Sequence, residues 1–160
     1  MLKLDPMEAI CLNDEDTPWI PFDLDGSVAL KYFHINPIKG EIVLLAKNKA
    51  GVKLPRHYHT GQVIVYTVAG YWKYAEHDWT AGPGSVVYEV AGSEHQPIIL
   101  PDHDVLAVNI VQGESFFYDE NGTQLGTMNC DFAMKTYLNY CEENGIKPKD
   151  LTTFNPTRFS

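Results

Sequence analysis

Short apolar runs separated by turn residues make up most of the chain between about residues 28 and 127. Strand-like runs, rich in β-branched and aromatic residues, are Ile42–Ala46, Gln62–Val68, Val86–Val90, Ile98–Leu100, Val105–Val111 and Ser115–Tyr118. Glycine- and proline-containing turns separate these runs at spacings of about 8–12 residues, which is typical of all-β sandwiches and barrels. The pattern therefore predicts an all-β domain.

The dipeptide Asn121-Gly122 follows the last of these runs. Both central residues of a type I′ turn need positive φ angles, which asparagine and glycine tolerate best. The sequence therefore predicts a two-residue hairpin turn at this point.

Beyond the hairpin, the spacing of the apolar residues changes from that of a strand to that of a helix. Met134, Leu138 and Cys141 recur at helical spacing with Tyr137 beside them, which predicts an amphipathic helix over about Asp131–Glu143. Asn129 or Asp131 is expected to cap its start, and Gly145 and Pro148 to mark its end.

Three segments follow from these patterns. Residues 1–27, with Pro6, Pro18 and Pro21, are expected to form an extended N-terminal arm. Residues 28–127 are expected to form the β-domain, and residues 128–160 a C-terminal helix and tail. No internal repeat or low-complexity tract divides the chain further.

Charge and composition narrow the class of function. The 160 residues include 12 basic and 21 acidic ones, giving a net charge of −9, and no basic run is present. Nucleic acid and anionic membranes are therefore not expected partners. The N-terminus lacks signal-peptide character, no apolar run reaches the ~20 residues of a membrane helix, and Cys11, Cys130 and Cys141 form no paired framework. We expect a cytoplasmic protein.

Two of the six histidines stand one residue apart in His57-Tyr58-His59. Side chains alternate along a strand, so His57 and His59 point to the same face and form half of a metal site. Neutral imidazole binds most divalent first-row metals, and affinity requires several converging ligands.

A frame of glycines and a further histidine surrounds this pair. Gly51 precedes His57 by five intervening residues, and the frame continues with Gly70, Gly84, Gly92 and His95. This spacing resembles the two sequence motifs of the cupin superfamily. Three positions depart from those motifs, because Val63 replaces the first-motif glutamate, Val90 a proline and Ile99 an asparagine.

The cupin resemblance implies a double-stranded β-helix (jelly-roll) barrel with a metal in its mouth, held by His57, His59 and His95. Because Val63 occupies the glutamate position, three neutral ligands are expected to leave the 2+ charge of the metal uncompensated. Such a site suits a substrate that chelates as an anion through two oxygens and leaves a position for O₂.

Longer stretches resemble the 2,4′-dihydroxyacetophenone dioxygenase family of cupins. They are His57-x-His59-Thr60-Gly61, Tyr71-Trp72-x-Tyr74-x-Glu76-His77-Asp78-Trp79 and Pro83-Gly84-Ser85-x-Val87-Tyr88-Glu89. The three-histidine set is also similar to that of acetylacetone-cleaving dioxygenases. The resemblance implies Fe(II), with zinc or nickel as other occupants of a purified sample. It also implies O₂-dependent cleavage of a C–C bond beside a carbonyl in an aromatic hydroxyketone or a diketone.

Several further residues are candidates for the site. Glu89 is expected either to orient a ligand and remove a substrate proton, or to face solvent at a strand end. Glu76 and Glu94 are alternative carboxylates. Tyr66, Trp72 and Tyr88 are candidate substrate-binding aromatics, and Arg56 could meet an anionic substrate at the rim. His34, His77 and His103 are expected to be structural or exposed.

Two other function classes remain open at this point. One is a zinc-binding sensory or regulatory cupin similar to the C-terminal domain of anti-sigma factors, and the other is a non-oxidative small-molecule-binding cupin. Val63 and the short, poorly helical N-terminal segment count against the regulatory hypothesis. Pairing of edge strands predicts a homodimer, with a homotetramer as the alternative.

Overall fold

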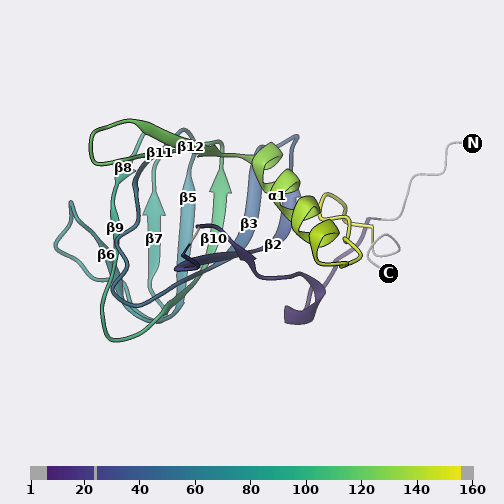
Figure 1. Cartoon of the computed structure of the whole chain (residues 1–160), viewed down its shortest axis with the longest axis horizontal. Helices are drawn as coiled ribbons and strands as arrows, with labels where there is room; N and C mark the ends of the chain where they lie inside the picture. Colours follow the sequence, from purple (N-terminus) through teal and green to yellow (C-terminus); the bar gives the residue numbers. More distant parts are fainter. Residues whose placement is uncertain (1–6, 24, 156–160) are drawn as a thin grey trace, which may run out of the picture.

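The computed structural model describes residues 7–23 and 25–155 of the chain and confirms the all-β prediction (Figure 1). Two antiparallel sheets build the domain. The larger has the order β1-β2-β3-β10-β5-β7, the smaller β12-β11-β4-β8, and β6 and β9 form a separate pair. The strands are β1 (Ile20–Pro21), β2 (Val28–Asn36), β3 (Glu41–Asn48), β4 (Arg56–His59), β5 (Val63–Ala69), β6 (Trp72–Tyr74), β7 (Val86–Glu89), β8 (Glu94–His95), β9 (Pro97–Ile99), β10 (Val105–Gln112), β11 (Ser115–Tyr118) and β12 (Gln124–Met128).

Alternation along the strands of the larger sheet separates its two faces. Ile42 and Leu44 on β3, and Val63 and Val65 on β5, are buried on the inner face, which meets the smaller sheet. Residues between them point outward and are more exposed. The domain core therefore lies between the two sheets, as in other sandwiches and jelly rolls.

The glycines of the sequence frame hold left-handed backbone conformations. Gly51, Gly70, Gly84 and Gly92 have φ angles of 77°, 79°, 87° and 85°. A side chain at Gly70 would also clash with the backbone, because its Cβ would lie 2.3 Å from the carbonyl oxygen of Asp104. The spacing of the frame thus marks the tight turns between strands.

The β11–β12 hairpin forms, but its turn differs from the prediction. Gly122 has a φ of 81°, whereas Asn121 has no positive φ. The amide of Gly122 bonds to the carbonyl of Asp119, and the Asp119 carboxylate accepts the amides of Asn121 and Thr123. A longer turn with a single left-handed glycine replaces the two-residue type I′ turn, because Asp119 supplies its own turn hydrogen bonds.

The helix α1 spans Cys130–Glu143, one residue earlier than predicted. Its N-cap is Asn129, whose side chain accepts the amide of Phe132 at 2.9 Å. Ala133, Tyr137 and Cys141 form its buried face, whereas Leu138 is exposed, so the predicted apolar face was rotated from the observed one. In the described part of the chain, no helix has the length and apolar character needed to span a bilayer.

The predicted N-terminal arm carries some regular structure. A short 3₁₀ helix, η1 (Asp14–Asp16), precedes β1, and β1 pairs with β2. The helix α1 lies beside β2 and β3 (Figure 1). Residues 1–6, 24 and 156–160 of the predicted arm and tail lie outside the described residues, and the segment boundaries at 27/28 and 127/128 stay predictions.

We expect Gly70→Ala to lower the free energy of unfolding by about 2 kcal/mol or more, because it adds both a strained φ and a backbone clash. Gly126→Ala is the matched control, since Gly126 has no positive φ and open space at its Cβ position. Urea denaturation followed by circular dichroism measures both. Equal stability of the two variants would contradict the role assigned to Gly70.

Candidate functional site

Three histidines converge from two paired strands of the smaller sheet. His57 and His59 lie on β4, and His57 stands directly opposite His95 on β8. The nitrogen atoms that these three side chains offer to a metal lie within 4.8 Å of one another. The structure thus brings together the three residues that the sequence frame singled out.

Hydrogen bonds at Nδ1 fix the ring orientation of two of the histidines. Nδ1 of His57 lies 3.1 Å from the carbonyl oxygen of Pro55, and Nδ1 of His59 lies 3.0 Å from Oγ of Ser115. A carbonyl only accepts, so Nδ1 of His57 carries the proton and Nε2 keeps its lone pair. This is how proteins orient histidine ligands of metals.

A carboxylate completes the cluster. Glu89 is on β7 and pairs directly with Val63 of β5. Its Oε2 lies 3.0 Å from Nε2 of His59 and 3.3 Å from Nε2 of His95. The strand next to β5 thus brings a carboxylate beside the three imidazoles, although Val63 occupies the glutamate position of the motif. Glu89 is also buried, which excludes the solvent-facing alternative.

Tyr74 is a site residue that the sequence pattern does not distinguish from the other aromatic residues. Its hydroxyl donates a hydrogen bond to Oε1 of Glu89. Its ring stacks on that of His95, with centroids 3.9 Å apart and planes inclined by 15°. Tyr74 therefore holds both a carboxylate and an imidazole of the cluster in place.

The electrostatics of the cluster favour a neutral His57 and an ionised Glu89. Burial, followed by the proximity of His59 and His95, lowers the pKa of His57 to about 3. Burial alone would raise the pKa of Glu89, but contacts with His59 and His95 outweigh it and hold that pKa below its usual range. Burial and the Glu89 carboxylate raise the pKa of Tyr74.

The buried atoms at the centre of the cluster fit a bound cation. Nε2 of His59, Nε2 of His95 and Oε2 of Glu89 are shielded from solvent and have no hydrogen-bond partner other than one another, at 3.0 Å and 3.3 Å. Burying polar atoms with so few partners is costly. A divalent metal would bind the lone pairs of the ring nitrogens and offset the charge of the oxygen beside them, and imidazole is a ligand that zinc, iron and nickel accept.

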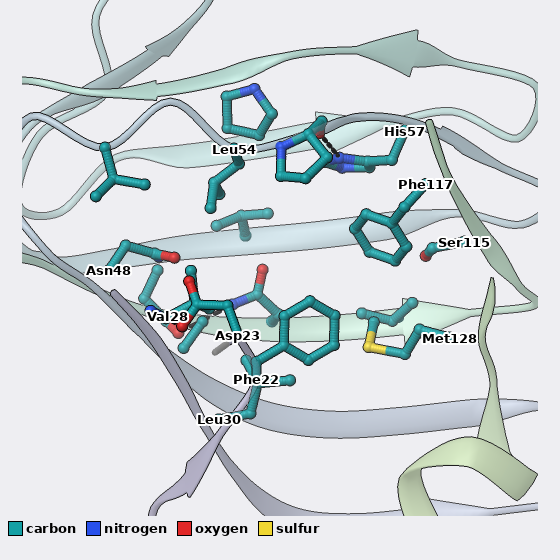
Figure 2. A pocket seen from close by; sticks show the side chains of 18 of the residues that line it. Phe22, Asp23, Val28, Leu30, Asn48, Leu54, His57, Ser115, Phe117 and Met128 are labelled. Atoms are coloured by element: carbon teal, nitrogen blue, oxygen red, sulfur yellow. Dashed lines mark hydrogen bonds between the residues drawn. The ribbon is translucent and has the colours of Figure 1, made fainter. Parts of the chain in front are cut away.

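A large cavity opens beside the histidines, between the two sheets. It has a volume of about 790 Å³ and is lined mainly by the inward side chains of both sheets, with His57 and Glu89 in its wall. In Figure 2, His57 and Leu54 lie along one wall, and Phe22, Val28 and Leu30 along the opposite wall. The cavity is large enough for an aromatic small molecule.

Not all of the predicted substrate-binding residues reach this cavity. Trp72 lines it, with its indole N–H bonded to Thr67. Tyr66 and Tyr88 are 46% and 62% exposed, because alternation places them on the opposite face from Val65 and Glu89. Their assignment to the cavity wall is therefore wrong.

The remaining polar candidates also lie away from the cluster. Arg56 forms a surface ion pair with Glu94, with Nε and Oε1 3.1 Å apart, and does not line the cavity. Glu76 accepts the amide of Gln96 instead of approaching the histidines. The other three histidines lie elsewhere: His34 packs against Phe154 with its ring tilted, His77 stacks on Trp79, and His103 is exposed.

Solved structures of other proteins share this fold. An RmlC-like cupin protein from Ralstonia eutropha JMP134 is 47% identical, with 92% of this chain and 96% of that chain covered and a TM-score of 0.88. An acetylacetone dioxygenase from Acinetobacter johnsonii is 18% identical over 87% of this chain and 96% of that one, with a TM-score of 0.72.

A more distant likeness is to the anti-sigma factor ChrR in its complex with SigE from Rhodobacter sphaeroides. It is 20% identical, covers 62% of this chain and 51% of that chain, and has a TM-score of 0.52. At such identities the likenesses to ChrR and to the acetylacetone dioxygenase concern the fold alone. Comparison with curated proteins gives no match.

The family of the chain follows from its sequence and its fold together. Residues 7–113 match the family model described as the ChrR cupin-like domain, which is more than half of the chain. The jelly-roll arrangement and the three-histidine cluster agree with that match. This chain belongs to the ChrR cupin-like domain family of the cupin superfamily.

Proposed function

We propose that this protein is a mononuclear non-haem metal dioxygenase that cleaves a C–C bond beside a carbonyl group, with Fe(II) as its metal. The observation that carries the proposal is the cluster of three converging imidazoles, two of them buried, beside a large apolar cavity. The substrate is an aromatic hydroxyketone or a β-diketone, as the sequence resemblance to 2,4′-dihydroxyacetophenone dioxygenases implies.

His57, His59 and His95 would hold the metal through their ring nitrogens. When bound, a redox-active divalent metal supplies Lewis acidity to the substrate oxygens and electrons to O₂. The hydrogen bonds of His57 to Pro55 and of His59 to Ser115 keep those rings aimed at one point without rearrangement.

Glu89 is placed to take a proton from the substrate. Its Oε1 is engaged by the Tyr74 hydroxyl, which leaves Oε2 as the free acceptor at the cluster. A hydroxyketone or β-diketone must lose a proton to chelate as an enolate, and an ionised carboxylate beside the bound oxygens accepts it. Tyr74 keeps the carboxylate from turning away from the substrate.

The shape and polarity of the cavity support an aromatic substrate. Its walls are mostly aliphatic and aromatic, with Phe22 and Phe117 packed at a centroid distance of 5.7 Å. A small diketone would fill only part of about 790 Å³, whereas an aromatic ring would also bury apolar surface against these walls.

A zinc-binding regulatory domain is the second candidate. The family match is to ChrR-like cupins, and Glu89 adds an oxygen to the three imidazoles. Four protein ligands around zinc form a closed site that needs no substrate. The identity of the metal and the consumption of O₂ separate this candidate from the dioxygenase.

Substrate preference gives one test. We expect the Fe(II)-loaded protein to consume O₂ with 2,4′-dihydroxyacetophenone-like hydroxyketones at least about 10-fold faster than with acetylacetone at equal subsaturating concentration, because more apolar surface is buried. An oxygen electrode measures both rates. Stoichiometric zinc in freshly purified protein, with no O₂ consumption after iron loading, would favour the regulatory candidate instead.

We expect His59→Ala to abolish both metal retention and O₂ uptake, because it removes one of three converging ligands. Metal content measured by mass spectrometry, together with oxygen-electrode rates, gives the result. His103→Ala is the matched control, since His103 is exposed and outside the cluster. If His59→Ala keeps its iron and its turnover, the site has been placed wrongly.

We expect Glu89→Gln to reduce O₂ uptake per bound metal by at least about 10-fold, because the amide keeps the shape of the side chain but cannot accept the substrate proton. Rates are compared at equal metal occupancy, so that a change in metal affinity does not affect the comparison. Glu94→Gln removes an exposed carboxylate from β8 and should leave the rate unchanged. An unchanged rate in Glu89→Gln would remove Glu89 from the chemistry.

A further inference from the structure

The cavity between the two sheets contains a buried amide at the end away from the histidines. In Figure 2, Asn48 and Asp23 lie at one end of the cavity, and Ser115 and Met128 lie at the other. Asn48 is the last residue of β3, and it is only 7% exposed. Its side chain points into the cavity (Figure 2). The mainly apolar wall therefore has a polar group far from the candidate metal site.

Strand register gives the separation between Asn48 and the histidine end of the cavity. On β10, Val105 lies opposite Asn48. Val111, at the other end of this strand, lies opposite Val63, which pairs with Glu89 of the cluster. The six residue steps from Val105 to Val111 span about 20 Å, at about 3.3 Å per residue. A single-ring hydroxyketone held at the histidines is shorter than this distance and does not reach Asn48.

The side-chain amide of Asn48 has no hydrogen-bond partner among the residues that the structure describes. Other polar side chains of the cavity wall are paired. Asn109 donates to the carbonyl of Ala107, and Asp23 accepts the amide of Val28. Burying an unpaired amide is costly. A ligand in the cavity would supply the missing hydrogen bonds.

The Asn48 side chain does not stabilise the turn that follows it. Asparagine beside a turn commonly bonds to the backbone amide two residues further on. Here that amide, of Ala50, bonds to the carboxylate of Asp104 instead. The amide of Lys49 bonds to the carbonyl of Ser27. Other groups therefore hold the turn, and the Asn48 amide is left free for the cavity.

We propose that Asn48 is a specificity-determining residue that binds a neutral hydrogen-bonding group at the far end of an extended substrate. This role rests on the proposed function, because it adds a remote polar group to the ketone whose oxygens lie at the histidines. An amide both donates and accepts hydrogen bonds, so it matches a hydroxyl or a carboxamide. The apolar walls between the two ends suit an aromatic ring or an alkyl chain.

The charges at this end of the cavity favour a neutral group over an anionic one. Val28 pairs with Asn48 in the sheet, and its amide bonds to the Asp23 carboxylate. Asp25 also lines the cavity, and Lys53 in the same wall is exposed. The two carboxylates would repel a substrate carboxylate placed beside Asn48. A hydroxyl or a carboxamide meets no such repulsion.

A stability measurement separates a binding role from a structural one. We expect Asn48→Leu to have a urea midpoint at least equal to that of the wild type, because it replaces an unpaired amide by an apolar group of similar size. Circular dichroism follows the unfolding. A lower midpoint would show that the amide stabilises the fold, and this result would overturn the proposal.

Calorimetry on the zinc-loaded chain, which cannot turn substrate over, measures the specificity. The probes are hydroxymethyl phenyl ketones with para alkyl chains of increasing length, each ending in a methyl, a hydroxyl or a carboxyl group. We expect a chain length at which the hydroxyl form binds at least about 10-fold tighter than the methyl form. Asn48→Leu should abolish this preference. Asn121→Leu is the matched control, because Asn121 is exposed in a turn, and it should keep the preference.

Three results would overturn the role of Asn48. They are the lack of a hydroxyl preference at every chain length, a preference that persists in folded Asn48→Leu, and tighter binding of the carboxyl form than of the hydroxyl form. None of them bears on O₂ uptake with a single-ring hydroxyketone, which does not reach Asn48. Conversely, an iron-loaded chain that consumes no O₂ but keeps the hydroxyl preference would reject the dioxygenase alone.

Discussion

Glu89 carries a negative charge into the interior of the protein, and only part of that charge is compensated there. Tyr74 donates to one oxygen, while the other oxygen faces two imidazole nitrogens and has no further hydrogen-bond partner. Burying such groups costs several kcal/mol unless a cation or hydrogen bonds offset the loss of water. A divalent metal held by the histidines would offset this penalty.

Strand pairing is what allows the fold to hold these groups so close together. The register of β4 with β8 sets His57 opposite His95, and pairing of β4 with β11 brings Ser115 beside His59. Pairing of β5 with β7 places Glu89 opposite Val63 in the larger sheet, where its Oε2 lies 3.0 Å from Nε2 of His59. Left-handed glycines such as Gly92 turn the chain tightly enough to bring these short strands together. The sandwich thus positions the cluster beside a cavity lined mainly by apolar side chains.

Much of this arrangement could be predicted from local sequence pattern. Alternation alone places His57 and His59 on one face, and the glycine spacing marks the turns that bring His95 to them. The position of Glu89 could not be derived, because it depends on which residue of β7 pairs with Val63, and cross-strand register is not written in either strand alone. The hydrogen bond of Tyr74 also depends on a second long-range pairing, that of β6 with β9. The exposure of Tyr66 and Tyr88, in contrast, follows from alternation once Val65 and Glu89 are known to point inward.

The proposed dioxygenase chemistry rests on the combination of three converging histidines, one ionised carboxylate and an apolar cavity of about 790 Å³. The most direct test of the reaction is isotope labelling with ¹⁸O₂ of the Fe(II)-loaded protein in the presence of an aromatic hydroxyketone. Mass spectrometry of the products should find one labelled oxygen atom in each of the two carbonyl or carboxyl fragments. Cleavage products that carry oxygen only from water, or no products at all from the fully iron-loaded protein, would contradict the assignment.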